Sequence, residues 1–159
     1  MAHTKMVGNT SEAFVLAGFL SVGFQVCVPF GEGSRYDLVV DAGGHLLRVQ
    51  CKTASKVPGM DALRFKARSV RKDPGSNVIV TQTYRDQADL FAAYSPVTGK
   101  VYVLPVDECP VTDVWLRLTP AKNNQQIGIR MAEEHTLEAW AARYSASSPS
   151  GVLSAAGRL

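Results

Sequence analysis

The sequence predicts an α+β domain in which helices flank a mixed central sheet. Residues 10–22 place apolar side chains around most of a helical circumference, as expected for a helix that the rest of the fold covers. Short runs rich in Val, Leu and aromatic residues follow it, which is typical of strands. Residues 136–143 have the pattern of a short closing helix. One helix, a series of strands and a last helix fit a single domain, for which 159 residues suffice.

The first helix has recognisable start and stop signals. Thr10 or Ser11 can cap its N-terminus, which would place Glu12 in the first turn, where the helix dipole favours an anion. Gly23 is suited to a left-handed C-cap. We therefore expect the helix to span residues 10–22.

The strands are predicted from β-favouring runs separated by turn residues. Gly43 and Gly44 stand between the second and third runs and suit a two-residue hairpin turn that needs positive φ. A second hairpin is expected around residues 96–99. The predicted strands are residues 24–30, 36–41, 46–53, 63–67, 77–83, 89–94 and 100–106.

Composition limits the class of protein. The net charge of +3 is compatible with a nucleic-acid partner without indicating one. The three cysteines have no paired spacing, which predicts reduced thiols and no zinc site. No apolar run approaches the ~20 residues of a membrane span, and no signal peptide is recognisable, so we expect a cytoplasmic protein without a membrane partner. Residues 1–144 should form the domain and residues 145–159 a disordered tail, with Trp115 and Trp140 in the core.

The first hairpin gathers polar side chains on one face. Pairing outward from Gly43 and Gly44 puts Asp37 opposite Gln50, and Lys52 shares the face of Gln50. A register slip of one residue would separate them. The other face is apolar and should enter the core through Leu38, Val40, Val49 and Cys51.

This set of groups is what phosphodiester hydrolysis needs. Asp37 can hold Mg²⁺, which prefers oxygen ligands, and Glu12 can add a second carboxylate from the helix. The metal polarises a phosphate and activates a water molecule. Lys52 can orient or deprotonate that water or stabilise the developing charge. Each residue also has an ordinary structural interpretation, and an unrelated α+β domain with a chance hairpin stays an alternative.

These residues resemble the PD-(D/E)xK nuclease superfamily. Asp37 matches its first Asp, residues 50–52 (Gln-Cys-Lys) match its (D/E)xK element, and Glu12 matches its helical Glu. The chain is most similar to the branch of group I intron-type homing endonucleases. The similarity is carried by residues 29–54, 89–108 and 116–134 and extends from residue 7 to 139.

The resemblance implies a restriction-endonuclease-like core and a DNA endonuclease that uses Mg²⁺ or Mn²⁺. It implies Asp37, Glu12 and Gln50 as metal ligands and Asp37, Gln50, Lys52 and Glu12 as the catalytic set. Two positions depart from the superfamily pattern: Tyr36 replaces Pro, and Gln50 replaces a carboxylate. A neutral amide binds Mg²⁺ less strongly than a carboxylate, which leaves the number of metal ions open.

Double-stranded DNA is the expected partner, contacted by Ser34, Arg35, Lys56, Lys66 and Arg68. A homodimer or higher homo-oligomer is expected, because twofold symmetry matches the duplex. Two functional alternatives stay open. One is a structure-specific nuclease of the Holliday-junction-resolvase type, which shares this core. The other is a non-catalytic DNA-binding module, which the neutral Gln50 motivates.

Overall fold

The computed structural model describes residues 2–31, 33–73, 75–76, 78–120 and 130–147. Two α-helices and two short 3₁₀ helices lie in these ranges. They are α1 (Ala2–Ser21), η1 (Val106–Glu108), η2 (Ala132–His135) and α2 (Leu137–Ser147). Neither described α-helix has the length and apolar character needed to cross a membrane.

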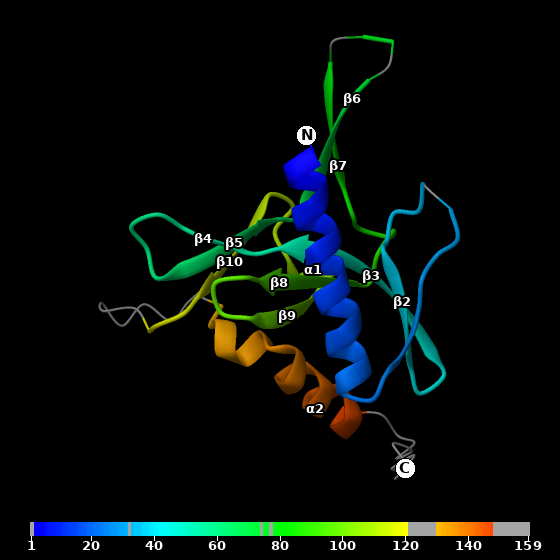
Figure 1. Cartoon of the computed structure of the whole chain (residues 1–159), viewed down its shortest axis with the longest axis vertical. Helices are drawn as coiled ribbons and strands as arrows, with labels where there is room; N and C mark the ends of the chain where they lie inside the picture. The colour runs from blue at the N-terminus through cyan, green and yellow to red at the C-terminus, as the bar shows by residue number, and fades with distance from the viewer. Residues whose placement is uncertain (1, 32, 74, 77, 121–129, 148–159) are drawn as a thin grey trace.

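The predicted α+β class with a mixed sheet is confirmed. The central sheet has the strand order β1-β2-β3-β8-β9, in which β3 and β8 are parallel and the other neighbours antiparallel. Its strands are β1 (Gln25–Cys27), β2 (Leu38–Ala42), β3 (His45–Thr53), β8 (Leu90–Ser95) and β9 (Lys100–Pro105). Figure 1 shows α1 and α2 packed on this sheet.

Two smaller sheets complete the described chain. One has the order β10-β5-β4, and the other is the two-stranded hairpin of β6 and β7. Their strands are β4 (Ser55–Lys56), β5 (Ala62–Lys66), β6 (Arg68–Lys72), β7 (Ile79–Thr83) and β10 (Asp113–Arg117). The β6–β7 hairpin projects from the body of the protein (Figure 1).

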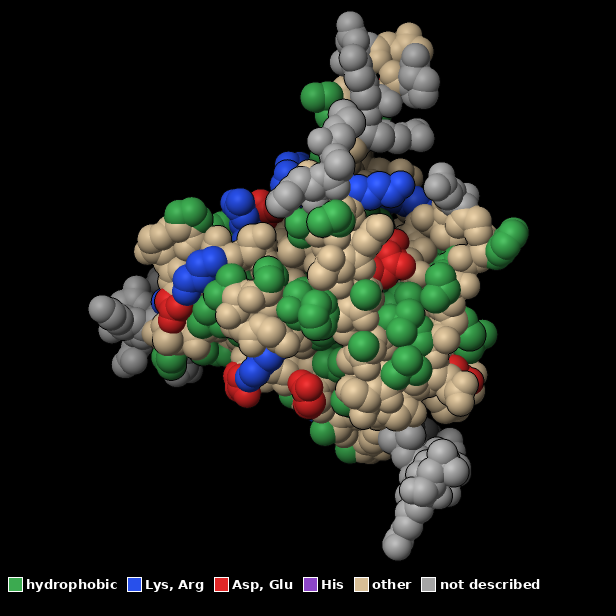
Figure 2. Space-filling model, viewed as in Figure 1, with side chains coloured by type: hydrophobic (Ala, Val, Ile, Leu, Met, Phe, Trp, Pro, Cys, Tyr) green, Lys and Arg blue, Asp and Glu red, His purple; other side chains and the backbone are tan. Residues whose placement is uncertain are grey.

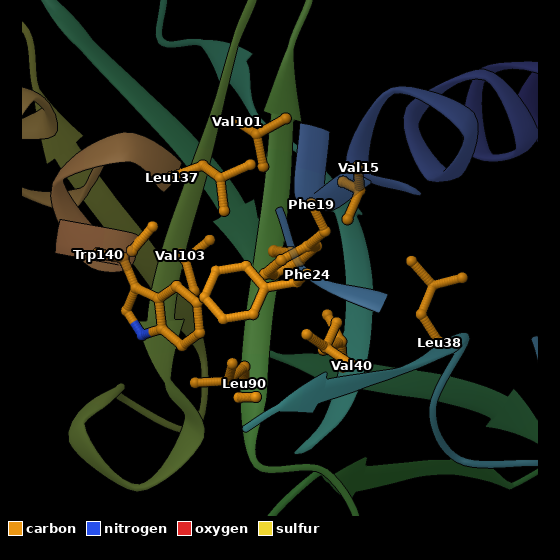
Figure 3. Close-up of a cluster of buried hydrophobic side chains, with 14 of the residues drawn as sticks. Val15, Phe19, Phe24, Leu38, Val40, Leu90, Val101, Val103, Leu137 and Trp140 are labelled. Carbon is orange, nitrogen blue, oxygen red and sulfur yellow. The ribbon is translucent and has the colours of Figure 1, made fainter. Parts of the chain in front are cut away.

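The central sheet is buried on both faces. One face packs against the two helices through a cluster that includes Phe19, Val40 and Trp140 (Figure 3). The other face packs against β5 and β10 through a second cluster that includes Phe65, Phe91 and Leu116. In this second cluster the residues of the central sheet come from β8 and β9, and none of its members lies in β2 or β3.

The start of the first helix differs from the prediction. α1 begins at Ala2, so Thr10 and Ser11 lie inside it instead of capping it. The Thr10 hydroxyl donates to the carbonyl of Met6 at 2.8 Å, one turn earlier in the helix. The predicted C-cap is confirmed: Gly23 has φ of 91°, and the Phe24 amide donates to the Phe19 carbonyl as in a Schellman motif.

Other differences concern strands and boundaries. The separate strands β4, β6 and β10 were not predicted. β4 and β6 are short and mostly polar, so they lack the apolar alternation that marks a strand. β10 does alternate, with Val114 and Leu116 buried and Trp115 exposed, but this pattern was missed in the sequence. Trp115 was predicted in the core, but it lies on β10 with 38% of its surface exposed, beneath the Arg64 guanidinium. Trp140 is buried as predicted. The predicted tail starts too early, since α2 continues to Ser147, and residues 148–159 lie outside the described part of the chain.

Candidate active site

The β2–β3 turn sets the register of the site. Gly43 and Gly44 have φ of 69° and 92°, which β-hairpin turns of this length require and which glycine adopts without strain. The register confirms the predicted pairing of Ala42 with His45. Beyond the last paired residues, the Asp37 amide donates to the Val49 carbonyl at 2.9 Å, so the ladder continues to the site.

Asp37 stands at the open end of this hairpin, half-buried. Its Oδ2 accepts a hydrogen bond from the Cys51 amide at 2.7 Å and another from the Gln50 side-chain amide. Burial raises the pKa of the Asp37 carboxyl, while the Cys51 amide, the nearby Lys52 charge and Gln50 oppose that rise. The two hydrogen bonds therefore fix the position of the carboxylate, but together with Lys52 they only partly offset the cost of burying its negative charge.

Glu12 approaches the same end of the hairpin from α1. The neighbouring Ser11 is buried and shares a hydrogen bond of 2.6 Å with the Thr53 hydroxyl on β3, which fixes this turn of the helix against the strand. Burial raises the pKa of the Glu12 carboxyl, and repulsion from Asp37 raises it further. The two carboxyl groups are therefore close enough to repel one another in partly desolvated surroundings, and a divalent cation would relieve that repulsion.

Lys52 points to the other side of the hairpin from Cys51. Its ammonium donates to the Tyr84 hydroxyl at 3.0 Å and lies 4.2 Å from the centroid of the Tyr84 ring. The Arg35 guanidinium lies 4.5 Å from the same centroid. Tyr84 was missed by the sequence reasoning, since nothing near it in the chain connects it to a lysine 32 residues away.

The residues present fit a hard divalent cation. Two carboxylates and an amide oxygen are the donors that Mg²⁺ prefers. Among the described residues, Gln50 Oε1 accepts no hydrogen bond, while Gln50 Nε2 binds Asp37 and the Cys51 carbonyl. Across the residues that the structure describes, no group of three or more His, Cys, Asp or Glu side chains is arranged to hold a metal ion, so the amide oxygen of Gln50 would have to complete the set. Burial raises the pKa of the Cys51 thiol, so the thiol is protonated in the metal-free protein.

The five predicted DNA contacts do not form one cluster. Lys56, on β4, forms an ion pair with Asp61, and Lys66 is exposed at the end of β5. Arg68 is partly buried at the base of the β6–β7 hairpin, and Ser34 is exposed beside the site. The Arg35 guanidinium is instead engaged internally, in hydrogen bonds to Ser69 Oγ, the Thr83 carbonyl and Gln87 Oε1.

Comparisons with known proteins agree with this geometry. A family model described as PD-(D/E)XK endonuclease matches residues 2–138. Among solved structures, the chain is similar to a bacterial homing endonuclease, I-Ssp6803I, with a TM-score of 0.70 and 26% sequence identity. The match covers 90% of this chain and 94% of the other. A comparison with curated proteins found no match. The family model matches most of the sequence, and the fold is that of a known endonuclease. The chain belongs to the PD-(D/E)XK endonuclease family.

Proposed function

We propose that this protein is a Mg²⁺-dependent endodeoxyribonuclease that hydrolyses phosphodiester bonds in double-stranded DNA. The observation that carries the proposal is the position of Asp37, hydrogen-bonded to Gln50 and to the Cys51 amide at the end of the hairpin that also presents Lys52. Glu12 is near enough for its carboxyl group to be repelled by Asp37. Nucleases of this family generally use divalent metals. The likeness to a homing endonuclease supports cleavage at defined DNA sites.

Each side chain has a distinct task in this proposal. Asp37 and Glu12 would hold the cation through carboxylate oxygens. Gln50 would add its Oε1, while its Nε2 donates to Asp37. When bound, Mg²⁺ polarises the scissile phosphate and makes a water molecule more acidic. Lys52, whose ammonium is held by the Tyr84 hydroxyl, would orient that water or stabilise the negative charge that develops on the phosphate. Mn²⁺ would suit the same oxygen donors.

The DNA backbone is proposed to run past the base of the β6–β7 hairpin. Figure 2 shows Lys and Arg side chains near there, with a small acidic area below them on the same face. Ser34, Lys66 and Arg68 are the proposed phosphate contacts on this side. Lys56 lies on a strand that extends in another direction (Figure 1), so we propose a peripheral contact for it. The internal bonds of Arg35 leave it able to contact DNA only through its remaining N–H groups.

One site per chain cuts one strand, so we propose that the protein acts as a homodimer or a larger homo-oligomer. Light scattering during gel filtration, under the conditions in which double-strand breaks form, measures the mass of the active species. A monomer that makes double-strand breaks would contradict the proposal.

Cleavage tests the proposed function directly. Purified protein is incubated with supercoiled plasmid, phage DNA and a four-way junction, in Mg²⁺, Mn²⁺ or EDTA, beside a Lys52→Ala variant. We expect cleavage of linear or supercoiled duplexes that requires the metal and is lost in the variant, by about 10²-fold or more. Preferential cleavage of the junction would instead support a structure-specific nuclease.

The neutral Gln50 is the one feature that favours a non-catalytic DNA-binding module. A Gln50→Glu variant, which restores the carboxylate of the family pattern, separates the two functions. Metal-dependent cleavage by the wild type excludes the binding module. Binding of the same DNA without cleavage by the wild type, together with cleavage by Gln50→Glu, would establish that the native chain binds DNA without cutting it.

A further inference from the structure

The ammonium of Lys52 lies in an aromatic environment. Its Nζ is 3.0 Å from the Tyr84 hydroxyl, 4.2 Å from the centroid of that ring and 6.0 Å from the centroid of Phe91. Within the described part of the chain, the Tyr84 hydroxyl is the one acceptor that Lys52 uses. A lysine side chain has four rotatable carbon–carbon bonds and three N–H donors, so an undirected ammonium would sample many positions.

Tyr84 is itself held rigidly. Only 6% of it is exposed, and its ring meets Phe91 edge to face, with centroids 5.6 Å apart and an interplanar angle of 85°. Its backbone carbonyl accepts hydrogen bonds from the Gln87 and Ala88 amides. A buried ring fixed at both its edge and its backbone can hold the hydroxyl at a defined point beside β3.

Arg35 fixes the same ring from another direction. Its guanidinium, 4.5 Å from the centroid of Tyr84, donates to Ser69 on β6 at 2.9 Å and to the Thr83 carbonyl on β7 at 3.0 Å. It also donates to Gln87 Oε1 at 2.6 Å. Two cations therefore face one aromatic ring, whose negative face attracts both of them and reduces the cost of placing them close together.

We propose that Tyr84 is a positioning residue for Lys52, holding one N–H of the ammonium so that the other two are directed to the reacting phosphate and water. The inference rests on the proposed function, because it assigns the task of Lys52 to the phosphodiester reaction. Tyr84 touches neither DNA nor metal in this arrangement. It acts through the lysine and therefore affects the rate of the chemical step more than the affinity for DNA.

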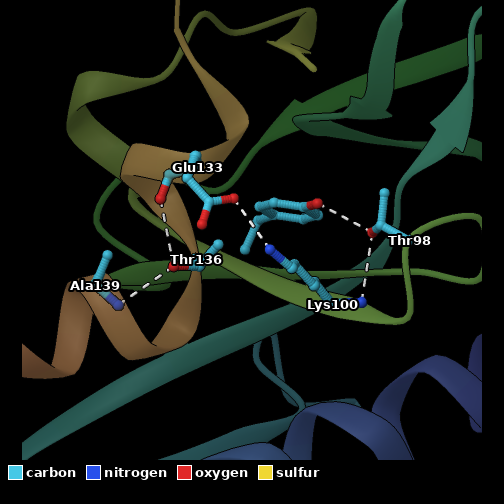
Figure 4. A network of polar contacts seen from close by, with 6 residues as sticks. Thr98, Lys100, Glu133, Thr136 and Ala139 are labelled. Carbon is cyan, nitrogen blue, oxygen red and sulfur yellow. Dashed lines mark hydrogen bonds and ion pairs between the residues drawn. The ribbon is translucent and has the colours of Figure 1, made fainter. Parts of the chain in front are cut away.

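Tyr84→Phe tests the proposal, since it removes the hydroxyl and retains the ring. Tyr102→Phe is the matched control. Tyr102 is also buried, with 1% of it exposed, and it belongs to the same hydrophobic cluster. Its hydroxyl donates a hydrogen bond to Thr98 at 3.0 Å, and Figure 4 shows the polar network around Thr98. Both variants lose one tyrosine hydrogen bond, so a general effect on the fold should be similar in the two.

Wild type is compared with the Tyr84→Phe, Tyr102→Phe and Lys52→Ala variants. For each protein we measure the single-turnover rate at which plasmid or phage DNA is cleaved in Mg²⁺. We also measure the Kd for the same DNA in EDTA and the midpoint of thermal unfolding. For Tyr84→Phe we expect a rate about 10-fold to 100-fold below wild type, as for other residues that orient a reacting group. Its Kd and midpoint should match those of Tyr102→Phe, which should cleave like wild type.

The other outcomes are distinguishable. A Tyr84→Phe variant that cleaves like Tyr102→Phe, or that loses affinity and rate together, overturns the positioning role. A large fall in its midpoint alone, relative to the control, assigns Tyr84 a structural role and also overturns it. If Lys52→Ala and Tyr84→Phe both retain wild-type activity, the lysine has no role in the reaction. Absence of metal-dependent cleavage by wild type contradicts the proposed function itself.

Discussion

Asp37→Asn is expected to abolish cleavage and to leave the fold intact. Asn has the same shape and keeps an oxygen that can accept the hydrogen bond of the Cys51 amide, but it has no charge to hold a cation beside Glu12. Several kcal/mol of transition-state stabilisation depend on that cation, which corresponds to a loss of about 10³-fold or more in single-turnover rate. Quench-flow or gel assays with enzyme in excess over DNA measure it.

The stability of the same variant follows from the pKa of Asp37. Burial raises that pKa in the folded protein, so the folded state binds the proton more tightly than the unfolded chain does. The protonated carboxyl group therefore favours folding of the metal-free protein. This contribution is complete below the ordinary pKa of aspartate and is lost as the pH rises through the raised pKa of the folded state. An uncharged Asn avoids this cost, and we expect the thermal midpoint at neutral pH, measured in EDTA, to be no lower than that of wild type.

Asp41→Asn is the matched control. Asp41 lies on β2, four residues after Asp37, and its Oδ1 accepts a hydrogen bond of 2.8 Å from the Gly44 amide in the turn. The change in charge is identical, but the residue is remote from Glu12 and Lys52 along the hairpin. It should retain cleavage within about twofold, as expected for a surface substitution away from the reacting groups. If both variants lost cleavage activity equally, the negative charge of this segment in general, and not the Asp37 carboxylate in particular, would control activity.

Phe19→Ala should cause the largest loss of stability. Phe19 is completely buried between α1 and the central sheet, with its ring 6.2 Å from that of Phe24 and 5.8 Å from that of Trp140. Removing a buried phenyl group leaves a cavity and typically costs about 3–5 kcal/mol. For a domain of this size, that loss lowers the thermal midpoint by roughly 6–20 °C.

Leu20→Ala provides the comparison on the same helix. Leu20 is the next residue of α1, and 51% of it is exposed. Both substitutions place Ala in the same helix, so helix propensity contributes little to the difference between them. We expect a cost below about 1 kcal/mol for Leu20→Ala, measured by urea unfolding. Similar midpoints for the two variants would contradict the position of Phe19 in the core.

The sequence by itself determined the elements that depend on neighbouring residues. Gly43 and Gly44 specify a tight turn, because the turn requires positive φ at both positions. The turn fixes the register, and the register places Asp37 opposite Gln50. Gly23 ends α1 for the same local reason. The resemblance to PD-(D/E)xK nucleases then connected these residues with Glu12, and the family match confirms that resemblance.

Only the tertiary structure decided which distant residues meet. It pairs β3 with β8 in parallel, starts α1 at Ala2 against β3 and β8, and leaves Trp115 exposed on β10. It also brings Tyr84 to Lys52 and engages Arg35 with the β6–β7 hairpin. Such contacts depend on packing between segments far apart in the chain and on the closure of the intervening loops. Local backbone preferences encode the hairpin, whereas no local pattern encodes the partner of a side chain that the hairpin presents.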